Sequence, residues 1–325
     1  MDKINWGIIG CGDVTEVKSG PAFNKVANSS LIAVMRRDAE KAKDYAQRHN
    51  VPKWYANAQQ LINDPDINAI YIATPPSSHE EYTLAAIDAG KPVYVEKPMA
   101  NTYAAAIHMA QAAKAANVKL TVAHYRRQQP FFLYIKQLLN DKAIGEPLVA
   151  RLVFDRPAIT TEELAKPGNA WRTDPAIAGG GLFHDLAPHQ LDLMYYFFGN
   201  AKKVNGMANQ QGRLYAADDM VLGNILFENG VGFNGSWCFN APIDTDICEI
   251  TGTNGKISFP VFGSYIITLT SAENVITTIN FDALQHVQQP MIEKTVQYFL
   301  GQAGNPCSGE EGAEIMRIMG EMVGK

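Results

Sequence analysis

The chain has 325 residues, which is longer than one typical hydrophobic core and predicts two domains. Its content of 46% hydrophobic and 19% charged residues is ordinary for a globular protein. The formal net charge of −5, without any run of Lys or Arg, argues against a nucleic-acid partner.

The N-terminus and the apolar segments predict a cytoplasmic protein. The first residues, MDKINWGIIGCG, lack the long apolar region of a signal peptide. No segment offers the roughly 20 apolar residues that a membrane helix needs, so no membrane partner is expected. The cysteines lack CxxC spacing, and reduced thiols are expected at Cys11, Cys238, Cys248 and Cys307.

Residues 1–123 alternate apolar runs with helix-like stretches. The runs are short, β-branched and nearly continuous, as in parallel strands that are covered on both faces. They read, in chain order, INWGIIG, SLIAVMRR, INAIYIATPP, KPVYVEKP and VKLTVAHY. The stretches between them include DAEKAKDYAQRHN, SSHEEYTLAAIDAG and NTYAAAIHMAQAAKAAN. This alternation predicts a doubly wound α/β domain with a parallel sheet.

The first strand leads into a glycine turn at Gly10-Cys11-Gly12, and a helix is expected to follow. Glycines at this position let the backbone approach a pyrophosphate at the helix N-terminus, so the turn predicts a dinucleotide site. The third small residue of the GxGxxG pattern is replaced by Thr15, and a glycine turn without a ligand is the alternative. The expected contacts are Gly10, Gly12, Asp13 and Val14.

The end of the second strand, AVMRRDAEKA, indicates which dinucleotide is bound. NAD-binding proteins usually place an acid there, which accepts hydrogen bonds from the ribose 2′-hydroxyl. Arg36 and Arg37 stand in its place, and an arginine pair favours a 2′-phosphate. The sequence therefore favours NADP over NAD, with two solvated surface arginines as the alternative. Asp38 is expected to cap the next helix.

Two later strand ends supply further candidates. In ATPPSSHEEY the predicted cofactor contacts are Thr74, Pro75 and His79, and Ser77 or Ser78 is expected to cap the following helix. The alternative is that this segment only ends the strand and starts the following helix, without contacting a ligand. In VYVEKPMA, Glu96 and Lys97 are also predicted to contact the cofactor, because they follow a strand, where ligands of doubly wound sheets bind. A lysine there is suited to orienting a substrate hydroxyl, although a lone loop lysine is more often solvated.

Residues 124–325 predict an α+β domain with one large, open, mostly antiparallel sheet. A helix, FFLYIKQLLN, precedes a strand, LVARLVFDR. Strand-like segments then fill much of 201–280, separated by Glu-Asn-Gly and Thr-Asn-Gly turns that suit hairpins. Two helices, at about 287–301 and 309–323, are expected to close the chain.

The stretch GGGLFHDLAPHQLDL, residues 179–193, predicts an apolar helix with a polar stripe. Asp185 and His189 are four residues apart and share a face, which Asp192 continues. An acid–imidazole row of this kind suits one wall of a substrate pocket, because an imidazole transfers protons near pH 7. His184 is interpreted as a structural histidine. A metal site of His184, Asp185 and His189 is disfavoured, because no further ligand converges on them.

These motifs together resemble the Gfo/Idh/MocA family of nicotinamide-dependent oxidoreductases over nearly the whole chain. The resemblance is carried by GIIGCG at 7–12, EKP at 96–98, WR at 171–172 and GGGLFHDLAPH at 179–189. It implies a Rossmann domain, residues 1–123, followed by a substrate-binding and oligomerisation domain, residues 124–325. The expected assembly is a homodimer or homotetramer built on the open sheet.

The resemblance also implies roles for single residues. Lys97 is expected to be the catalytic lysine, Asp185 the acid that holds substrate or relays a proton, and His189 the general acid/base. In relatives a cis peptide often precedes the proline of EKP, which would turn Lys97 into the cleft. The remaining candidates for contacts with a sugar or polyol-like substrate are Tyr125, Arg126, Trp171 and Arg172, each of which is equally suited to a structural pairing.

The expected activity is hydride transfer between NADP or NAD and a hydroxyl or carbonyl carbon of a sugar or polyol-like substrate. Two other functions stay open at this point. The first is a redox-neutral sugar lyase or glycosidase that uses bound NAD, and net cofactor consumption distinguishes it. The second is a non-catalytic dinucleotide-sensing regulator, which the set of Lys97, Asp185 and His189 argues against.

Overall fold

The computed structural model describes residues 2–166 and 170–324. The chain forms two compact units. The first unit comprises Met1–Gln129 and Leu284–Met316, and the second comprises Pro130–Ala283 and Arg317–Lys325. The predicted division had a single boundary, at residue 123. It did not include the return of the chain to the first unit near its end.

The first unit is built on a parallel sheet of six strands, counted over the described residues, in the order β3-β2-β1-β4-β5-β6. Every neighbouring pair in this sheet is parallel, and Ile8 of the first strand lies between Val34 and Tyr71. This is the doubly wound order expected of a dinucleotide-binding domain, and it confirms the predicted fold class. The strands are β1 (Ile4–Ile9), β2 (Ser29–Met35), β3 (Lys53–Tyr55), β4 (Ala69–Ile72), β5 (Val93–Val95) and β6 (Leu120–Val122).

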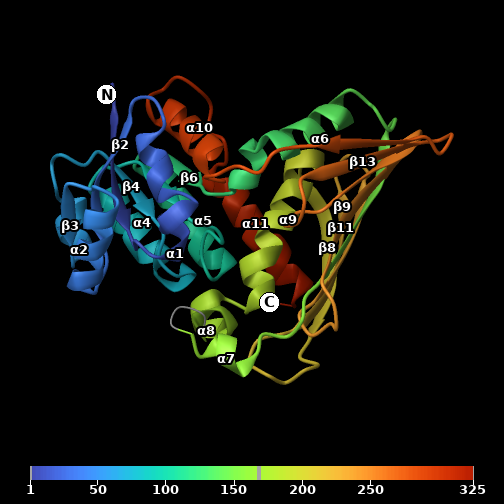
Figure 1. Ribbon diagram of the computed structural model, residues 1–325, viewed down its shortest axis with the longest axis horizontal. Coiled ribbons are helices and arrows are strands. Elements are labelled where there is room, and N and C mark those ends of the chain that lie inside the picture. Colours follow the sequence, from blue (N-terminus) through green and yellow to red (C-terminus); the bar gives the residue numbers. More distant parts are fainter. Residues whose placement is uncertain (1, 167–169, 325) are drawn as a thin grey trace. The chain divides into compact units, whose positions relative to one another are not determined.

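Helices connect these strands, and local sequence sets several of their ends (Figure 1). Asp38 caps α2 as predicted, because its Oδ1 accepts the backbone N–H of Lys41. The predicted serine cap of α4 was wrong: Ser78 occupies the N-cap position, but its hydroxyl donates toward Thr74 and Pro75 instead. The helices of this unit are α1 (Asp13–Val17), η1 (Gly20–Asn24), α2 (Ala39–Arg48), α3 (Ala58–Ile62), η2 (Pro76–Ser78), α4 (His79–Asp88), α5 (Tyr103–Ala115), η3 (Tyr125–Gln128) and α10 (Gln289–Phe299).

An aromatic cluster fills the core of the first unit beneath β1, β4 and β5. The ring of Phe23 lies 4.8 Å from that of Trp6 and 5.2 Å from that of Tyr71, and Tyr71 stacks on Tyr94 at 5.1 Å. These four side chains are fully buried. Every residue of β4 and β5 is buried as well, so these strands are covered on both faces, as expected for parallel strands.

The second unit is built on a sheet of eight strands, again counted over the described residues, in the order β14-β13-β12-β11-β7-β10-β9-β8. Only the β10–β7 pair of this sheet is parallel, which confirms a mostly antiparallel sheet. The strands are β7 (Pro147–Asp155), β8 (Ala201–Asn209), β9 (Met220–Phe227), β10 (Gly232–Cys238), β11 (Thr245–Gly252), β12 (Gly255–Phe259), β13 (Ile266–Ser271) and β14 (Ile276–Asn280).

Helices cover one face of this sheet and leave the other face open. Figure 1 shows α6 and α9 on the same side of the strands, and the ring of Phe183 on α9 packs 5.1 Å from Trp237 of β10. The helices are α6 (Pro130–Asn140), α7 (Thr161–Leu164), η4 (Ala170–Thr173), α8 (Pro175–Ala178) and α9 (Leu182–Phe198). A last helix, α11 (Gly309–Met322), contributes residues to both units.

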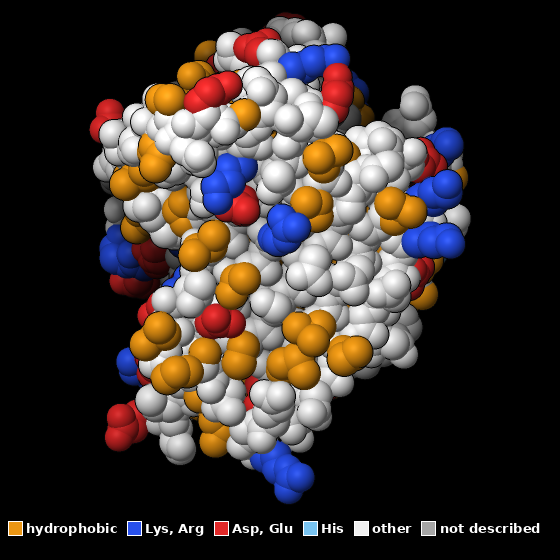
Figure 2. Space-filling model, turned by 90° about the vertical axis from the view of Figure 1, so that its right-hand side faces the viewer, with side chains coloured by type: hydrophobic (Ala, Val, Ile, Leu, Met, Phe, Trp, Pro, Cys, Tyr) orange, Lys and Arg blue, Asp and Glu red, His pale blue; other side chains and the backbone are white. Residues whose placement is uncertain are grey.

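Figure 2 faces the open side of the eight-stranded sheet, where apolar side chains are scattered between polar ones. Burial alternates along β9, so every second residue contributes to this face. The exposed apolar side chains of the strands are Leu148, Val153, Met207, Leu222, Leu226, Ile247, Ile266 and Ile276.

Among the described residues, every helix is too short or too polar to cross a membrane.

Candidate active site

The glycine turn after β1 packs closely against the end of a neighbouring strand. Gly10 has φ +95°, and a Cβ there would lie 2.8 Å from the backbone N of Thr74 and 2.9 Å from the carbonyl carbon of Ala73. Only glycine fits such a conformation and such a close approach without strain. The turn is thereby brought against the end of β4, where Thr74 and Pro75 lie half-buried.

The space next to Gly12 is open. The nearest heavy atom to a Cβ built there is the Gly10 carbonyl oxygen at 4.0 Å, so a phosphate group has room to approach this backbone. The hydroxyl of Thr15, at the unusual third position, is turned inward and donates to the Gly12 carbonyl at 2.7 Å. Asp13 is exposed and Val14 is half-buried at the start of α1. The residues present therefore fit a dinucleotide pyrophosphate.

Arg36 and Arg37 follow β2 and are exposed. The Nη1 of Arg36 donates toward the Cys11 carbonyl of the glycine turn at 3.4 Å. A fixed guanidinium beside that turn is suited to an anionic group on the adenosine ribose, because arginine binds phosphate through charge-assisted hydrogen bonds.

His79 is fully buried and joins two loops of the first unit. Its Nε2 lies 2.8 Å from the Thr74 carbonyl oxygen, and its Nδ1 lies 3.0 Å from that of Pro98. Burial lowers the pKa of His79. The ring therefore holds the end of β4 against the EKP segment, and direct contact of His79 with a nucleotide stays a prediction.

The EKP segment follows β5, and its Lys97–Pro98 peptide is cis. Glu96 is only 5% exposed, and its Oε1 accepts hydrogen bonds from the Tyr71 hydroxyl and from the Gln288 side chain, each at 2.6 Å. Its Oε2 accepts the backbone N–H of Lys97 at 3.2 Å. Lys97 itself is half-buried.

Tyr125 and Arg126 lie on η3, after β6, and both are buried. The Arg126 guanidinium lies 5.5 Å from the centre of the Tyr125 ring. The two predicted substrate contacts of the first unit therefore touch each other.

A second group of candidates lies at the start of α9. A Cβ at Gly180 would overlap the ring of His184, and one at Gly181, which has φ +77°, would overlap Ala217. Glycines therefore let the turn before α9 pack under the first turn of the helix and against the segment that precedes β9.

Asp185 faces Arg172. The Arg172 Nε lies 3.4 Å from Asp185 Oδ2, and both side chains are partly exposed. The same guanidinium lies over the ring of Trp171 at 4.9 Å. Three predicted residues of the second unit thus form one group, which presents a carboxylate, a guanidinium and an aromatic face, the chemistry that binds hydroxyl-rich ligands.

His189 lies one turn further along α9 and is 5% exposed. Its ring meets the ring of Phe262 edge to face at 5.4 Å. The backbone N–H groups of Val261, Phe262 and Gly263 all donate to the carboxylate of Asp246, which fixes the loop that carries Phe262. Asp192, the last member of the predicted stripe, is buried.

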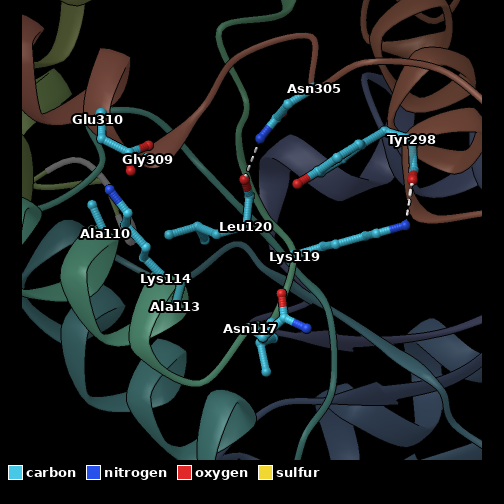
Figure 3. Close-up of a pocket in the computed structure, with 11 residues that line it drawn as sticks. Ala110, Ala113, Lys114, Asn117, Lys119, Leu120, Tyr298, Asn305, Gly309 and Glu310 are labelled. Atoms are coloured by element: carbon cyan, nitrogen blue, oxygen red, sulfur yellow. Dashed lines mark hydrogen bonds between the residues drawn. The ribbon is translucent and has the colours of Figure 1, made fainter. Parts of the chain in front are cut away.

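A cavity of about 400 Å³ lies elsewhere in the first unit, at the amino end of β6 (Figure 3). Figure 3 shows the Lys119 side chain reaching the Tyr298 carbonyl, at 2.8 Å, and Asn305 reaching the Leu120 carbonyl, at 2.7 Å. Ligands of doubly wound sheets bind beyond the carboxyl ends of the strands, where the glycine turn and the EKP segment lie. This cavity is therefore separate from the candidate dinucleotide site. Within residues 2–166 and 170–324, no group of three or more His, Cys, Asp or Glu side chains is arranged to hold a metal ion.

Comparison with family models decides the family. Residues 4–124 match the model described as an oxidoreductase family with an NAD-binding Rossmann fold, and residues 132–258 match the GFO/IDH/MocA C-terminal domain. An oxidoreductase from Formosa agariphila is 50% identical over 318 residues, which cover 98% of this chain and 97% of that protein. The chain belongs to the Gfo/Idh/MocA family of oxidoreductases.

More distant relatives of this Gfo/Idh/MocA chain are dehydrogenases and reductases. The inositol 2-dehydrogenase of Acidothermus cellulolyticus is 30% identical over 261 residues, covering 79% of this chain and 72% of that enzyme. The 1,5-anhydro-D-fructose reductase of Ensifer adhaerens is 28% identical over 262 residues, covering 78% and 74%. A levoglucosan dehydrogenase in complex with NADH and levoglucosan has the same fold, with a TM-score of 0.88, 23% identity and coverage of 98% and 96%.

Membership in the family gives the coarse function: the chain is an oxidoreductase with a nicotinamide dinucleotide site in its Rossmann domain. The structure also adds two side chains to the set derived from sequence, Tyr71 and Gln288, which bind Glu96. Tyr71 lies inside an apolar strand, and Gln288 is 192 residues from Glu96, so neither carried a local signal.

Proposed function

We propose that the chain is a dehydrogenase or reductase that transfers hydride between NADP and a hydroxyl or carbonyl carbon of a sugar or polyol-like substrate. The observation that carries the proposal is on α9. This otherwise apolar helix presents Asp185 to the Arg172 guanidinium and keeps an imidazole, His189, one turn further. Inositol, 1,5-anhydro-D-fructose and levoglucosan, named for the relatives, are all polyhydroxylated rings, which supports this substrate class.

The dinucleotide, when bound, supplies the hydride chemistry, and the chain's own residues bind, orient and move the proton. Gly10, Gly12 and the start of α1 hold the pyrophosphate. Asp185 accepts hydrogen bonds from substrate hydroxyls, with Arg172 keeping it ionised and oriented. An imidazole nitrogen of His189 takes the hydroxyl proton during oxidation and returns it during reduction, and the Lys97 ammonium polarises the same oxygen.

Replacing Lys97 with Met tests the chemical part of this proposal. Turnover on a panel of levoglucosan, myo-inositol and 1,5-anhydro-D-fructose, followed by NAD(P)H absorbance, is expected to fall by about 10²–10⁴-fold. Dinucleotide binding, measured without sugar, is expected to stay within threefold, because the lysine acts on the substrate. Full activity of Lys97→Met would refute the mechanism. Product formation without net NAD(P)H change would instead support redox-neutral chemistry.

The preference for NADP is supported by the two arginines after β2 and by the contact of Arg36 with the glycine turn. Titrating the protein with NADPH and with NADH, using energy transfer from tryptophan to the nicotinamide, tests this preference. Tighter binding of NADPH is the expected result. Equal or tighter binding of NADH would mean that the arginines are surface charges.

A homodimer or homotetramer built on the open face of the eight-stranded sheet completes the proposal. Val153 of β7 pairs in register with Ile247 of β11, and both side chains are exposed there. Burial of such apolar pairs stabilises association. Light scattering at micromolar concentration is expected to give an oligomer that Ile247→Lys dissociates, whereas Tyr103→Lys, an exposed change in the first unit, leaves it intact. A monomeric wild type would refute this part.

A further inference from the structure

The buried carboxylate of Glu96 is held from three sides. The Tyr71 hydroxyl and the Gln288 amide donate to Oε1, and the backbone N–H of Lys97 donates to Oε2. All the donors belong to the first unit. Tyr71 and Gln288 therefore hold the Glu96 carboxylate in place, and the carboxylate in turn holds the backbone nitrogen of Lys97.

Gln288 connects this carboxylate to distant parts of the first unit. It is fully buried, and its side-chain oxygen accepts the Tyr94 hydroxyl at 3.1 Å. Its backbone N–H donates to the Lys18 carbonyl at 3.2 Å, next to α1. The residue directly precedes α10, so the network joins β4, β5, α10 and the segment after the glycine turn.

The hydrogen-bond network around Glu96 is not expected to contribute much to the stability of the fold. Burying an ionised carboxylate costs several kcal/mol, which hydrogen bonds from neutral donors offset only in part, and apolar replacements at such sites are often neutral or stabilising. Burial raises the pKa of Tyr71 and of Tyr94 well above the ordinary value, with a further contribution from the charge of Glu96. Both tyrosine hydroxyls therefore stay protonated near neutral pH and act as hydrogen-bond donors.

We propose that Tyr71 and Gln288 are positioning residues that act through Glu96 on Lys97. They hold the carboxylate, and the carboxylate holds the Lys97 backbone N–H, which sets where the lysine side chain begins. Glu96 then serves as an anchor that holds Lys97 in place. Its position in the sequence had instead suggested a direct contact with the cofactor. The inference rests on the proposed catalytic role of Lys97.

Hydrogen exchange at the Lys97 amide tests this proposal without any substrate. Pro98 has no N–H, so the difference in exchange between a peptide that ends at Pro98 and one with the same start that ends at Glu96 reports on the Lys97 amide. In Tyr71→Phe and in Gln288→Leu, the carboxylate loses one donor, and exchange at Lys97 is expected to accelerate at least tenfold. The Val93 amide, which donates to the Lys119 carbonyl within the same sheet, is the internal reference and is expected to change less than threefold.

Thr295→Val is the matched control for a buried polar deletion on α10. The Thr295 hydroxyl is fully buried and donates only within the helix, to the Met291 carbonyl at 2.8 Å. This variant is expected to leave exchange at Lys97 within threefold of wild type. Unchanged exchange at Lys97 in both network variants would overturn the proposal, and so would an equal acceleration at Val93, because that indicates general loosening.

Turnover separates failure of this inference from failure of the proposed function. Tyr71→Phe is expected to lower kcat at least tenfold on whichever panel sugar is turned over, with NADPH affinity within threefold. In a Glu96→Gln background the same change is expected to have less than a threefold further effect, because the anchor is already weakened. If Lys97→Met abolishes turnover while Tyr71→Phe leaves kcat and exchange unchanged, only the positioning role is wrong. If Lys97→Met keeps full activity, the proposed function itself fails.

Discussion

In the first unit Arg36 and Lys97 follow the ends of buried parallel strands, whereas in the second unit Asp185 and His189 lie along one largely buried helix. Arg36 and Lys97 follow their strands at the carboxyl edge, so neither side chain occupies a position within a strand. On α9, by contrast, His189 and Asp192 interrupt the apolar face of the helix itself. Site residues at strand ends leave the buried core positions unchanged. Site residues on a helix face instead occupy positions that would otherwise be part of the apolar core.

The largest expected effect comes from the helix face. His189→Asn is expected to lower kcat by about 10²–10⁴-fold, because it removes the proposed proton acceptor. His184→Asn removes another buried histidine from the same helix, one whose ring packs against Phe183 at 5.5 Å. That control is expected to lower the melting temperature but to keep kcat within threefold. Equal losses of kcat in the two variants would show that α9 tolerates no polar change anywhere and that His189 has no special role.

The two sheets also differ in the burial of neighbouring residues within one strand. Ile8 and Ile9 of β1 are both fully buried, so either change to Ala is expected to cost about 2–4 kcal/mol of unfolding free energy. In β7, Leu152 is buried and its neighbour Val153 is 40% exposed. Leu152→Ala is expected to cost about 2–4 kcal/mol and Val153→Ala about 1 kcal/mol or less in the monomer.

Chemical denaturation of the four variants measures this difference, with tryptophan fluorescence and circular dichroism followed together because two units need not unfold in one step. A loss at Val153 as large as that at Leu152, under conditions where light scattering gives a monomer, would contradict the one-faced description of the sheet.

The same contrast explains how much could be predicted from sequence. The continuous apolar runs predicted β1, β2, β4, β5 and β6, and alternation with hairpin turns predicted most of the second sheet. Two strands carried too weak a pattern: β3 has only three residues, and β8 has no regular alternation of buried and exposed positions. Period and turn chemistry are local signals, so they report elements of ordinary length that have a covered face.

Long-range partners were not predictable for a physical reason. Gln288 binds Glu96 across 192 residues, and Asp246 fixes the loop of Phe262 from another strand. A buried polar residue in the sequence signals only that a partner exists, because burial without one is costly. It does not say which distant segment supplies that partner. The Asp185–Arg172 pair could have been predicted from sequence, since both residues are candidates for separate reasons.

A smaller effect is expected at the strand end after β2. Arg36→Ala is expected to raise the dissociation constant of NADPH by about 10–100-fold, since a hydrogen bond to a charged group contributes about 1.5–3 kcal/mol. The dissociation constant of NADH is expected to change less than threefold. Lys41→Ala is the control, because Lys41 is an exposed cation on the next helix that pairs with Asp38. An equal loss of affinity in Lys41→Ala would indicate general electrostatic attraction in place of a specific phosphate contact.

The smallest expected effect concerns a carboxylate of the first unit that lies away from the site. Burial alone raises the pKa of Asp64, but hydrogen bonds from Lys53, from the Asp66 amide and from Tyr55 outweigh it and lower the pKa to about 2. A depressed pKa contributes stability above the unfolded value of about 3.8, and this contribution is lost as the pH falls toward 2. Wild type is therefore expected to lose about 1–2 kcal/mol from this group between about pH 4 and pH 2.

Comparing the pH dependence of the unfolding free energy in Asp64→Asn and in Asp66→Asn isolates that contribution. Asp66 shares Lys53 but is largely exposed, so its loss is expected to leave most of the acid sensitivity in place. Asp64→Asn is expected to be less stable than wild type at pH 6 and to flatten the curve between pH 4 and pH 2. A wild-type curve retained in Asp64→Asn would mean that the acid sensitivity of the first unit arises from groups other than Asp64.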